Sequence, residues 1–560
     1  MAPHRVRLAT APKNGEHAAE LAHAALVAGL QRALAAAIPS AELQLIETHI
    51  SSVLLAGDAA YKLKKPVDLG FLDFTTLDAR RHFCELELAL NRRTAPQLYL
   101  EVVPITGTPA APALGGSGAV IDYAVKMRRF ESQDTFDHLL RRAALDAPLV
   151  DALAERVAGF HASIDVAPAG SRFGSPASIA GDVRANFAHI ERLAPPSALE
   201  GRLQRLRTWT ESESRALHER FAQRKAEGFV RECHGDLHLG NVARIDRTPV
   251  LFDCIEFNDA FRWIDVMSEI AFTVMDFVDH GAPALGWRFL NRVLESSGDY
   301  EGLAVLRYYL VYRAMVRAKV ALIRARQVGA DENVDNDASD ANVDCGALED
   351  FARHLADADA FAAVRPKVLI LTGGPSGSGK TTLAQDLLEA HGAVRLRSDI
   401  ERKRLHGLGA QARSNSAPGA GMYAPRATRA TYARLAALTQ SLLPTGFPII
   451  VDATFLHASD RADFLALGAA LNARCLLLWC DAPVDVLCAR VAARETAGSD
   501  ASEATLEILA RQLADLEPPA PGADTITTIR CDTSDATSIA RAKAEIARHC
   551  ADGATRQATR

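Results

Sequence analysis

The chain has 560 residues, which is too long for a single ordinary hydrophobic core and predicts two or three domains. Hydrophobic residues make up 48% of the sequence and charged residues 24%, a balance typical of a soluble globular protein. A formal net charge of -6 and a pI near 6.3 give no global electrostatic reason to expect binding to nucleic acid or to a membrane surface.

Cysteine spacing and the length of the apolar runs indicate the cellular compartment. The nine cysteines form no Cys-x-x-Cys pair and no cluster with zinc-ligand spacing, so we expect reduced, mostly buried thiols. Lys13, Glu16 and His17 interrupt any apolar signal region, and no apolar run approaches the ~20 residues needed to cross a bilayer. The sequence therefore predicts a cytoplasmic protein without a membrane partner.

The first predicted elements are a helix and a hairpin. Residues 16–38 are rich in alanine and leucine with helical spacing. Residues 49–56 and 59–64 alternate around the turn Gly57-Asp58, which predicts a β-hairpin. Ala60 and Lys62 share one face of its second strand, and Lys64 lies on the same face.

An acidic helix is expected next, from about Leu77 to Arg93, and it carries Glu85 and Glu87. Residues 99–105 and 121–128 then read as two strands separated by a loop rich in glycine, proline and alanine. From about 135 to 325 the pattern is helical, with one interruption.

That interruption is the stretch Arg-Glu-Cys-His-Gly-Asp-Leu-His-Leu-Gly-Asn-Val at 231–242, which sets Asp236 five residues ahead of Asn241. Residues 242–245 and 249–252 read as two short strands around a polar turn, and Asp253 follows the second strand. A hairpin of this kind returns Asp253 close to Asn241.

His234-Gly-Asp236, with Asn241 and Asp253, resembles the catalytic centre of the aminoglycoside phosphotransferase and choline kinase-like superfamily, whose members phosphorylate hydroxyl groups of small molecules. The resemblance implies that Asp236 accepts the proton of the attacking hydroxyl and that Asn241 and Asp253 bind Mg²⁺. The alternative is a loop of an unrelated domain in which the histidine is structural.

The same resemblance implies roles upstream of the catalytic loop. Ala60 would pack over the adenine of ATP, and Lys62 would reach its α- and β-phosphates, with Lys64 as the alternative. Glu87 is preferred over Glu85 as the carboxylate that fixes the lysine. Lysines on a solvated strand face are the competing interpretation of this run.

Other expectations concern supporting residues. Residues 127–130 are the expected hinge for adenine, His161 is expected to be a buried structural residue, and Asp265 is expected to support the catalytic loop. No Gly-x-Gly-x-x-Gly loop precedes Lys62, and Cys254 stands where protein kinases have phenylalanine, so the resemblance disfavours a protein kinase.

A second centre follows an acidic, polar stretch at 328–346, which predicts a linker, and a helix at 348–363. Residues 367–371 form a buried-strand run, residues 374–381 match G-x-x-x-x-G-K-[ST], and a helix is expected at 382–390. A glycine-rich connector without a ligand is the alternative.

The strand, loop and helix occur in the order that a phosphate-binding loop requires. Backbone N–H groups would converge on the β-phosphate, Lys380 would neutralise β/γ charge, and Thr381 would bind Mg²⁺. The residues expected to hold the nucleotide are Gly374, Pro375, Ser376, Gly377, Ser378, Gly379, Lys380, Thr381 and Thr382.

Later strands should complete a parallel sheet. Two of them, at 393–399 and 447–454, carry Asp399 and Asp452 near their carboxyl ends, and a fourth is expected at 475–480. Because ligand sites lie at the carboxyl ends of parallel strands, Asp399 and Asp452 should converge on Lys380.

These residues resemble the compact P-loop kinases related to gluconate kinase, the polynucleotide 5'-kinase domain and zeta-type toxins. The resemblance implies that Asp399 is the catalytic base and that Asp452 orients Mg²⁺ and its waters. Arg490 and Arg494 fall where the family's lid brings arginines onto the transferring phosphate; a salt-bridged surface helix is the alternative.

Basic residues crowd around Asp399 in an otherwise acidic protein. They could attract a sugar acid or a nucleic-acid end, although solvated helical faces would give the same composition. The residues are Arg395, Arg397, Arg402, Lys403, Arg404, Arg426, Arg429 and Arg434.

Together the two resemblances match a bacterial tandem family in which an aminoglycoside phosphotransferase-like domain is fused to an ATP-binding P-loop kinase domain. The expected fold is a two-lobed protein-kinase-like domain of mixed α/β and α+β class at 1–327, with lobes at about 40–130 and 131–327. A linker and helix at 328–364 and a P-loop parallel α/β sheet at 365–560 follow.

The leading functional prediction is a bifunctional ATP- and Mg²⁺-dependent kinase of small-molecule hydroxyls. In one alternative the C-terminal head is a nucleic-acid or nucleotide kinase. In another, one head is a non-catalytic ATP-binding regulatory module. Nucleic acid is a possible partner that the sequence does not favour, and the sequence specifies neither acceptor nor oligomeric state.

Overall fold

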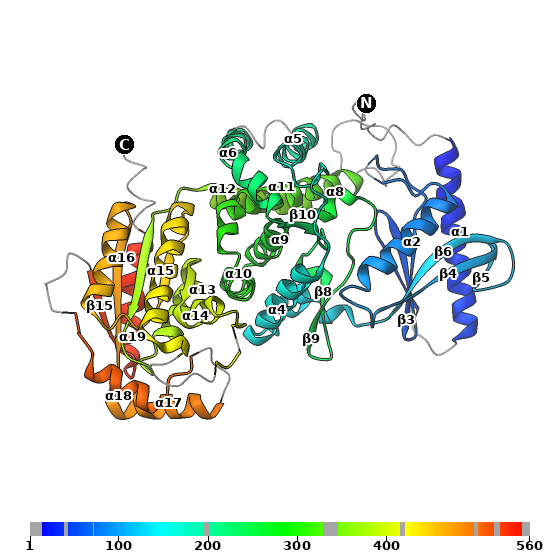
Figure 1. Ribbon diagram of the computed structural model, residues 1–560. Coiled ribbons are helices and arrows are strands. Elements are labelled where there is room, and N and C mark those ends of the chain that lie inside the picture. Colours follow the sequence, from blue (N-terminus) through cyan, green and yellow to red (C-terminus); the bar gives the residue numbers. More distant parts are fainter. Residues whose placement is uncertain are drawn as a thin grey trace. The chain divides into compact units, whose positions relative to one another are not determined.

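The computed structural model describes residues 14–38, 43–70, 72–194, 201–328, 345–410, 412–414, 421–497, 502–519 and 527–551 (Figure 1). Most of the linker predicted at 328–346 lies outside the described residues. The chain divides into two compact units. The first consists of 1–149, 163–175 and 225–273; the second of 150–162, 176–224 and 274–560.

An antiparallel six-stranded sheet of order β1-β2-β3-β6-β4-β5 is the centre of the first unit. Its strands are β1 (Leu43–Glu47), β2 (Ser51–Ala56), β3 (Ala59–Lys64), β4 (Tyr99–Thr108), β5 (Ala111–Leu114) and β6 (Val120–Arg128). The hairpin and the two later strands are as predicted, whereas β5 forms within the stretch expected to be a loop. An open sheet edge leaves backbone N–H and C=O groups without strand partners. Residues 111–114, which include apolar side chains, satisfy such groups by extending the sheet.

Two helices cover opposite faces of this sheet. Helix α1 (Asn14–Ala37) packs leucines such as Leu30 against Leu63 of β3. Helix α2 (Leu77–Asn91) begins at Thr76, whose side chain accepts a hydrogen bond from the Ala79 N–H, and packs on the other face. Because side chains alternate along a strand, Lys62 and Lys64 face α2.

The rest of the first unit carries the loop at 231–242 that is predicted to be catalytic. It contains α3 (Phe136–Arg141), β7 (Val230–Glu232), β8 (Val242–Ile245), β9 (Thr248–Leu251), α8 (Asp259–Arg262) and β10 (Trp263–Asp265). Strands β8 and β9 form the predicted hairpin. The prediction that 135–325 is otherwise helical is wrong at β10, where Trp263 pairs with Glu232 of β7.

Three helices contribute residues to both units: α4 (Ala147–Ser163), α7 (His218–Ala226) and α9 (Val266–Asp279). The second unit adds α5 (Pro176–Leu193), α6 (Arg202–Ala216), α10 (Pro283–Ser297), α11 (Leu303–Val328) and α12 (Cys345–Ala362). Helices α11 and α12 pack against each other. No helix of the described ranges combines the length and hydropathy that a membrane span requires.

A parallel five-stranded sheet of order β12-β13-β11-β14-β15 confirms the predicted P-loop fold class. Its strands are β11 (Val368–Gly373), β12 (Val394–Arg397), β13 (Ile449–Asp452), β14 (Arg474–Asp481) and β15 (Thr527–Asp532). The helices are α13 (Lys380–His391), α14 (Ser398–Leu405), α15 (Pro425–Leu442), α16 (Ala458–Ala470), α17 (Val484–Ala497), α18 (Leu506–Ala514) and α19 (Ala536–Ala551).

Helices lie on both faces of the parallel sheet. One face, which includes Ile370 and Leu478, packs against α13 and α19. On the other face, Gly468 of α16 lies against Leu369 and Cys475. The strands are buried on both sides, which explains their continuous apolar runs.

Candidate active sites

The loop at 231–242 brings two of the predicted site residues together. The Asn241 side-chain amide donates to the Asp236 carbonyl at 3.0 Å and to its carboxylate Oδ2 at 3.3 Å. Asn241 is buried, whereas 39% of the Asp236 side chain is exposed. The Asp236 side chain is therefore fixed by Asn241 and remains partly exposed.

Asp253 follows β9 in a left-handed backbone conformation, with φ of +63°. Its N–H donates to the Tyr99 hydroxyl at 3.1 Å, and the next N–H, of Cys254, donates to Asn91 Oδ1 at 2.8 Å. The left-handed region costs a non-glycine residue about 1–2 kcal/mol, which these two contacts help to offset.

Lys62 reaches this aspartate from the sheet. Its ammonium lies 2.5 Å from Asp253 Oδ1 and 2.9 Å from Glu87 Oε1. Burial by itself lowers the pKa of Lys62, but Asp253 and Glu87 reverse the direction and raise it well above the usual value. Glu85 lies elsewhere, on the exposed surface of α2, paired with Arg81 at 2.9 Å.

Lys64, the alternative phosphate ligand, occupies a closed site. It donates to Glu87 Oε2 at 2.7 Å and to Glu256, and it lies 5.0 Å from the centre of the Phe74 ring. Its side chain is 1% exposed. Burial raises the pKa of Glu87, but the ammonium groups of Lys62 and Lys64 outweigh it and bring the pKa to about 2.

Sequence reasoning missed the residues that hold the loop in place. Glu269 of α9 accepts from the Gly235 N–H at 2.7 Å, and the Thr273 hydroxyl donates to the Leu237 carbonyl at 2.8 Å. A fully buried glutamate in the apolar run of α9 was the available signal, since buried charges are paired. Gly235 has φ of +90°, and a Cβ there would lie 2.8 Å from the Phe261 carbonyl.

The two residues expected to be supporting are both buried. Asp265, at the end of β10, accepts from the Met267 N–H at 2.9 Å. His161 lies in the part of α4 that belongs to the second unit. The expected hinge begins at the end of β6, where Met127 is in register with Ala60.

The phosphate-binding loop of the second unit follows β11 and ends in α13. Gly374 and Gly377 have positive φ angles of 126° and 82°. A Cβ at Gly374 would lie 2.0 Å from the Cys480 carbonyl, so only glycine fits there. Gln512 of α18, which the sequence did not single out, accepts from the Ser376 N–H at 2.7 Å.

Asp452 lies beside the loop at the end of β13 and is 4% exposed. The hydroxyls of Thr381 and Thr372 each donate to its Oδ1 at 3.3 Å. A carboxylate and a threonine hydroxyl at this separation are a donor set that suits Mg²⁺.

Lys380 folds onto its own loop and donates to the Pro375 carbonyl at 3.2 Å. Burial lowers the pKa of Lys380, although the charges of Asp452 and then Asp399 oppose that shift. Asp399 lies in the first turn of α14, 28% exposed, with its Oδ1 3.7 Å from Arg402. The charges of Asp452 and Asp399 therefore both act on Lys380, as the sequence predicts.

The two predicted lid arginines make different contacts. Arg490 donates to the Gly377 carbonyl at 3.2 Å and to the Thr533 hydroxyl at 2.8 Å, so it joins the loop to the segment after β15. Arg494 has a buried Nη2 for which the described residues provide no hydrogen-bond partner. Its charge also lowers the pKa of Lys380.

Unmet hydrogen-bonding capacity provides a test of whether a nucleotide fits this loop. Besides Arg494 Nη2, the fully buried Ser378 hydroxyl has no partner among the described residues. Buried donors without partners are costly unless a ligand satisfies them. An anionic phosphate group would do so, and the donor set of this loop fits one.

The basic residues around Asp399 are mostly paired with carboxylates. Arg434 lies 3.4 Å from Glu401, which also pairs with Arg404, and Lys403 lies 3.5 Å from Glu503. These ion pairs neutralise much of the basic cluster that the sequence shows.

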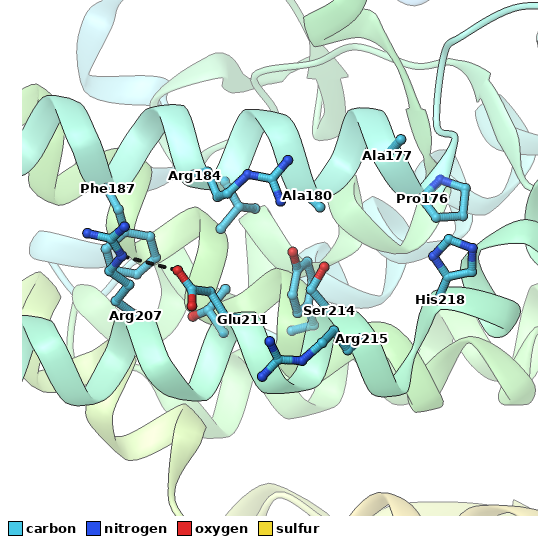
Figure 2. A pocket seen from close by; sticks show the side chains of 13 residues that line it. Pro176, Ala177, Ala180, Arg184, Phe187, Arg207, Glu211, Ser214, Arg215 and His218 are labelled. Atoms are coloured by element: carbon cyan, nitrogen blue, oxygen red, sulfur yellow. Dashed lines mark hydrogen bonds and ion pairs between the residues drawn. The ribbon is translucent and has the colours of Figure 1, made fainter.

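A separate cavity of about 540 Å³ lies in the second unit among α5, α6 and α11 (Figure 2). Arg184 of α5 and Arg207 and Arg215 of α6 line it, together with the buried Tyr308 of α11. Arg207 is paired with Glu211 at 3.1 Å, the contact marked by the dashed line. The remaining positive charge of the wall comes from Arg184 and Arg215.

Residues 369–519 match the AAA domain family. Uncharacterized protein Rv2004c of Mycobacterium tuberculosis and uncharacterized protein Mb2027c of Mycobacterium bovis are each 30% identical over 469 residues, which cover 84% of this chain and 90% of theirs. The chain belongs to the family of these proteins. Its C-terminal part is a P-loop domain with a parallel sheet of order β12-β13-β11-β14-β15.

Solved structures match at lower identity. A choline/ethanolamine kinase family protein from Mesorhizobium loti is 15% identical, covers 60% of this chain and 99% of its own, and has a TM-score of 0.35. A gluconokinase from Sinorhizobium meliloti is 21% identical, covers 34% and 96%, and has a TM-score of 0.24. Scores this low do not by themselves establish a shared fold, so the fold rests on the strand order and the sites.

Proposed function

We propose that this protein is a tandem kinase that depends on ATP and Mg²⁺, and that each of its two heads phosphorylates the hydroxyl group of a small molecule. The observation that carries the proposal is that a buried lysine in each unit lies among carboxylates. Lys62 contacts Asp253 and Glu87, and the charges of Asp452 and Asp399 act on Lys380.

In the N-terminal head, Asn241 and Asp253 would hold Mg²⁺, and Lys62, fixed by Glu87, would bind the α- and β-phosphates. The exposed carboxylate of Asp236 would accept the proton of the acceptor hydroxyl. Bound Mg²⁺ would neutralise the charge that develops on the transferred phosphoryl group.

In the C-terminal head, the loop from Gly374 to Thr382 would hold the phosphates, and Thr381 and Asp452 would hold Mg²⁺. Asp399 would accept the acceptor proton. The unmet donor of Arg494 makes it the better candidate to contact the transferred phosphate. Arg490 would stiffen the loop through Gly377 and Thr533.

Small-molecule acceptors are preferred for both heads over nucleic acid. Among the described residues, Arg404 and Arg434 are paired with Glu401, which lowers the positive charge that a polynucleotide would meet near Asp399. The domain limits that go with this proposal are the predicted ones, with the heads at 1–327 and 365–560.

The test measures Mg²⁺-dependent ATP consumption across a pool of metabolite acceptors for wild type, Asp236→Asn, Lys380→Ala and the double variant. We expect each single change to abolish phosphorylation of a different acceptor. Loss of the catalytic base in Asp236→Asn should lower the rate by a factor of at least ~10³. Asp246→Asn, in the exposed β8–β9 turn, is the matched control and should keep full activity. If one change abolishes all turnover while the other only alters its rate, one head is a regulator and the two-enzyme proposal fails.

A further inference from the structure

Helix α10 lies along the edge of the P-loop sheet. Among the described strands, β12 is an edge strand that pairs with β13 alone. The Asn291 side chain of α10 donates to the Ala393 carbonyl at 2.9 Å and accepts from the Arg395 N–H at 2.8 Å. An amide side chain thus makes the donor and acceptor contacts that a further strand would make.

Two more contacts fix the helix there. Arg288 pairs with Glu389 of α13 at 2.8 Å. The Trp287 ring lies over Gly392, where a Cβ would come within 2.9 Å of it, and meets Phe447 edge-on at 6.3 Å between centroids. Helix α10 therefore packs against the P-loop sheet and against α13.

From this position α10 places a buried carboxylate beside the nucleotide site. Glu295 is 2% exposed and accepts from Arg395 Nε at 3.0 Å and from Nη2 at 2.7 Å. Arg395 Nη1 in turn donates to the backbone carbonyl of Thr381 at 3.4 Å. One carboxylate is thus linked through one guanidinium to a residue expected to bind Mg²⁺.

The charge of Glu295 also acts on Arg397. Burial raises the pKa of Glu295, but Arg395 and then Arg397 outweigh it and hold the pKa below its usual value. Arg397 Nε lies 3.9 Å from Asp452 Oδ2. Without Glu295, less negative charge would offset Arg397 beside Asp452, in a site of low dielectric where charges are poorly screened.

We propose that Glu295 is a positioning residue of the P-loop site: by balancing the charges of Arg395 and Arg397, it keeps the Asp452 carboxylate available for Mg²⁺. The inference rests on the proposed function of this site. It means that a helix at 283–297, outside the P-loop segment at 365–560, completes the metal site of the C-terminal head.

The test uses the full chain and a fluorescent ATP analogue, titrated with Mg²⁺. In Glu295→Gln, which keeps the shape and removes the charge, we expect the half-saturating Mg²⁺ concentration for tight nucleotide binding to rise about 3- to 10-fold. Affinity for the analogue without Mg²⁺ should change less than 2-fold. A structural role alone would weaken both.

Two further variants separate charge from folding. Arg397→Gln should lower the half-saturating Mg²⁺ concentration, and in combination with Glu295→Gln it should restore the wild-type value. Glu155→Gln is the matched control. Glu155 of α4 pairs with Arg292, which lies on α10 like Glu295, and its carboxylate is half-exposed, 3.1 Å from Arg292 Nε. It should leave the titration unchanged.

An unchanged Mg²⁺ titration in Glu295→Gln, or an unchanged one in Arg397→Gln if the first variant does not fold, would overturn the inference. That result would leave the proposed function intact provided that Lys380→Ala still removes the C-terminal head's share of the binding. If wild type shows no Mg²⁺-dependent binding at all, the proposed function of this head fails first.

Discussion

Lys62 and Lys64 share the buried carboxylate of Glu87, yet their surroundings differ. Lys62 is 12% exposed and contacts Asp253, whereas Lys64 is enclosed by Glu87, Glu256 and Phe74. Lys62→Met should abolish N-terminal turnover with little loss of stability. Lys64→Met leaves Glu256 buried without its cation and should lower the free energy of unfolding by about 3–5 kcal/mol. Activity and urea denaturation, measured on both variants, test whether Lys62 or Lys64 is the phosphate ligand. If Lys64→Met is stable and inactive while Lys62→Met is active, Lys64 is the phosphate ligand.

His23 gives the small sheet a dependence on pH. Its ring is hydrogen-bonded to the Ser52 hydroxyl at 2.9 Å, and burial lowers its pKa to about 4. Because the unfolded chain keeps a pKa near 6.5, it takes up the proton first, and stability is lost as the pH falls from about 6.5 to 4. The full loss is about 3 kcal/mol.

His23→Gln stays neutral and should remove most of this slope between pH 7 and pH 5, measured by urea denaturation at each pH. The exposed His82→Gln is the control and should keep it. A slope that persists in His23→Gln would place the sensitivity elsewhere.

At the scale of elements, the end of α13 is closed by Gly392 with φ of +62° under Trp287 of α10. Gly392→Ala should cost about 1–2 kcal/mol in backbone strain and about 1–3 kcal/mol more in overpacking. Gly407→Ala has a similar φ of +70° with nothing within 4 Å, so it should cost only the strain. Equal losses of unfolding free energy in the two variants would contradict the packing of α10 on α13.

For the whole molecule, the compact units do not follow the predicted division at 328–364, because the second unit joins α10 and α11 to the P-loop sheet. A chain ending at residue 327 lacks α12, whose Phe351, Leu355 and Phe361 are buried. Each such side chain is worth about 1.5–3 kcal/mol. We expect this shortened chain to bind a hydrophobic dye and to lose cooperative thermal unfolding.

A chain ending at residue 364, which retains α12, serves as the comparison and should recover part of the cooperativity. If the chain that ends at 327 unfolds as sharply and at the same temperature as the full chain, the N-terminal head is autonomous after all.

Contacts between residues close in sequence could be predicted from the sequence. The β8–β9 hairpin carries Asp253 back toward Asn241, and the loop from Gly374 to Thr381 is one continuous segment between a strand and a helix. Such features depend on local propensity, turn residues and side-chain periodicity, which the sequence states directly. The predicted helix and strand limits therefore differ from the observed ones by only a few residues in most elements.

Only the tertiary structure decided the partners that are distant in sequence. Lys64 and Glu256 are 192 residues apart and Glu295 and Arg395 are 100 apart, and no local pattern pairs them. The same holds for β7 with β10 and for the contact of Arg490 with Thr533. The physical reason is that a buried charge must find a counter-charge, but the packing of elements determines which one lies within reach.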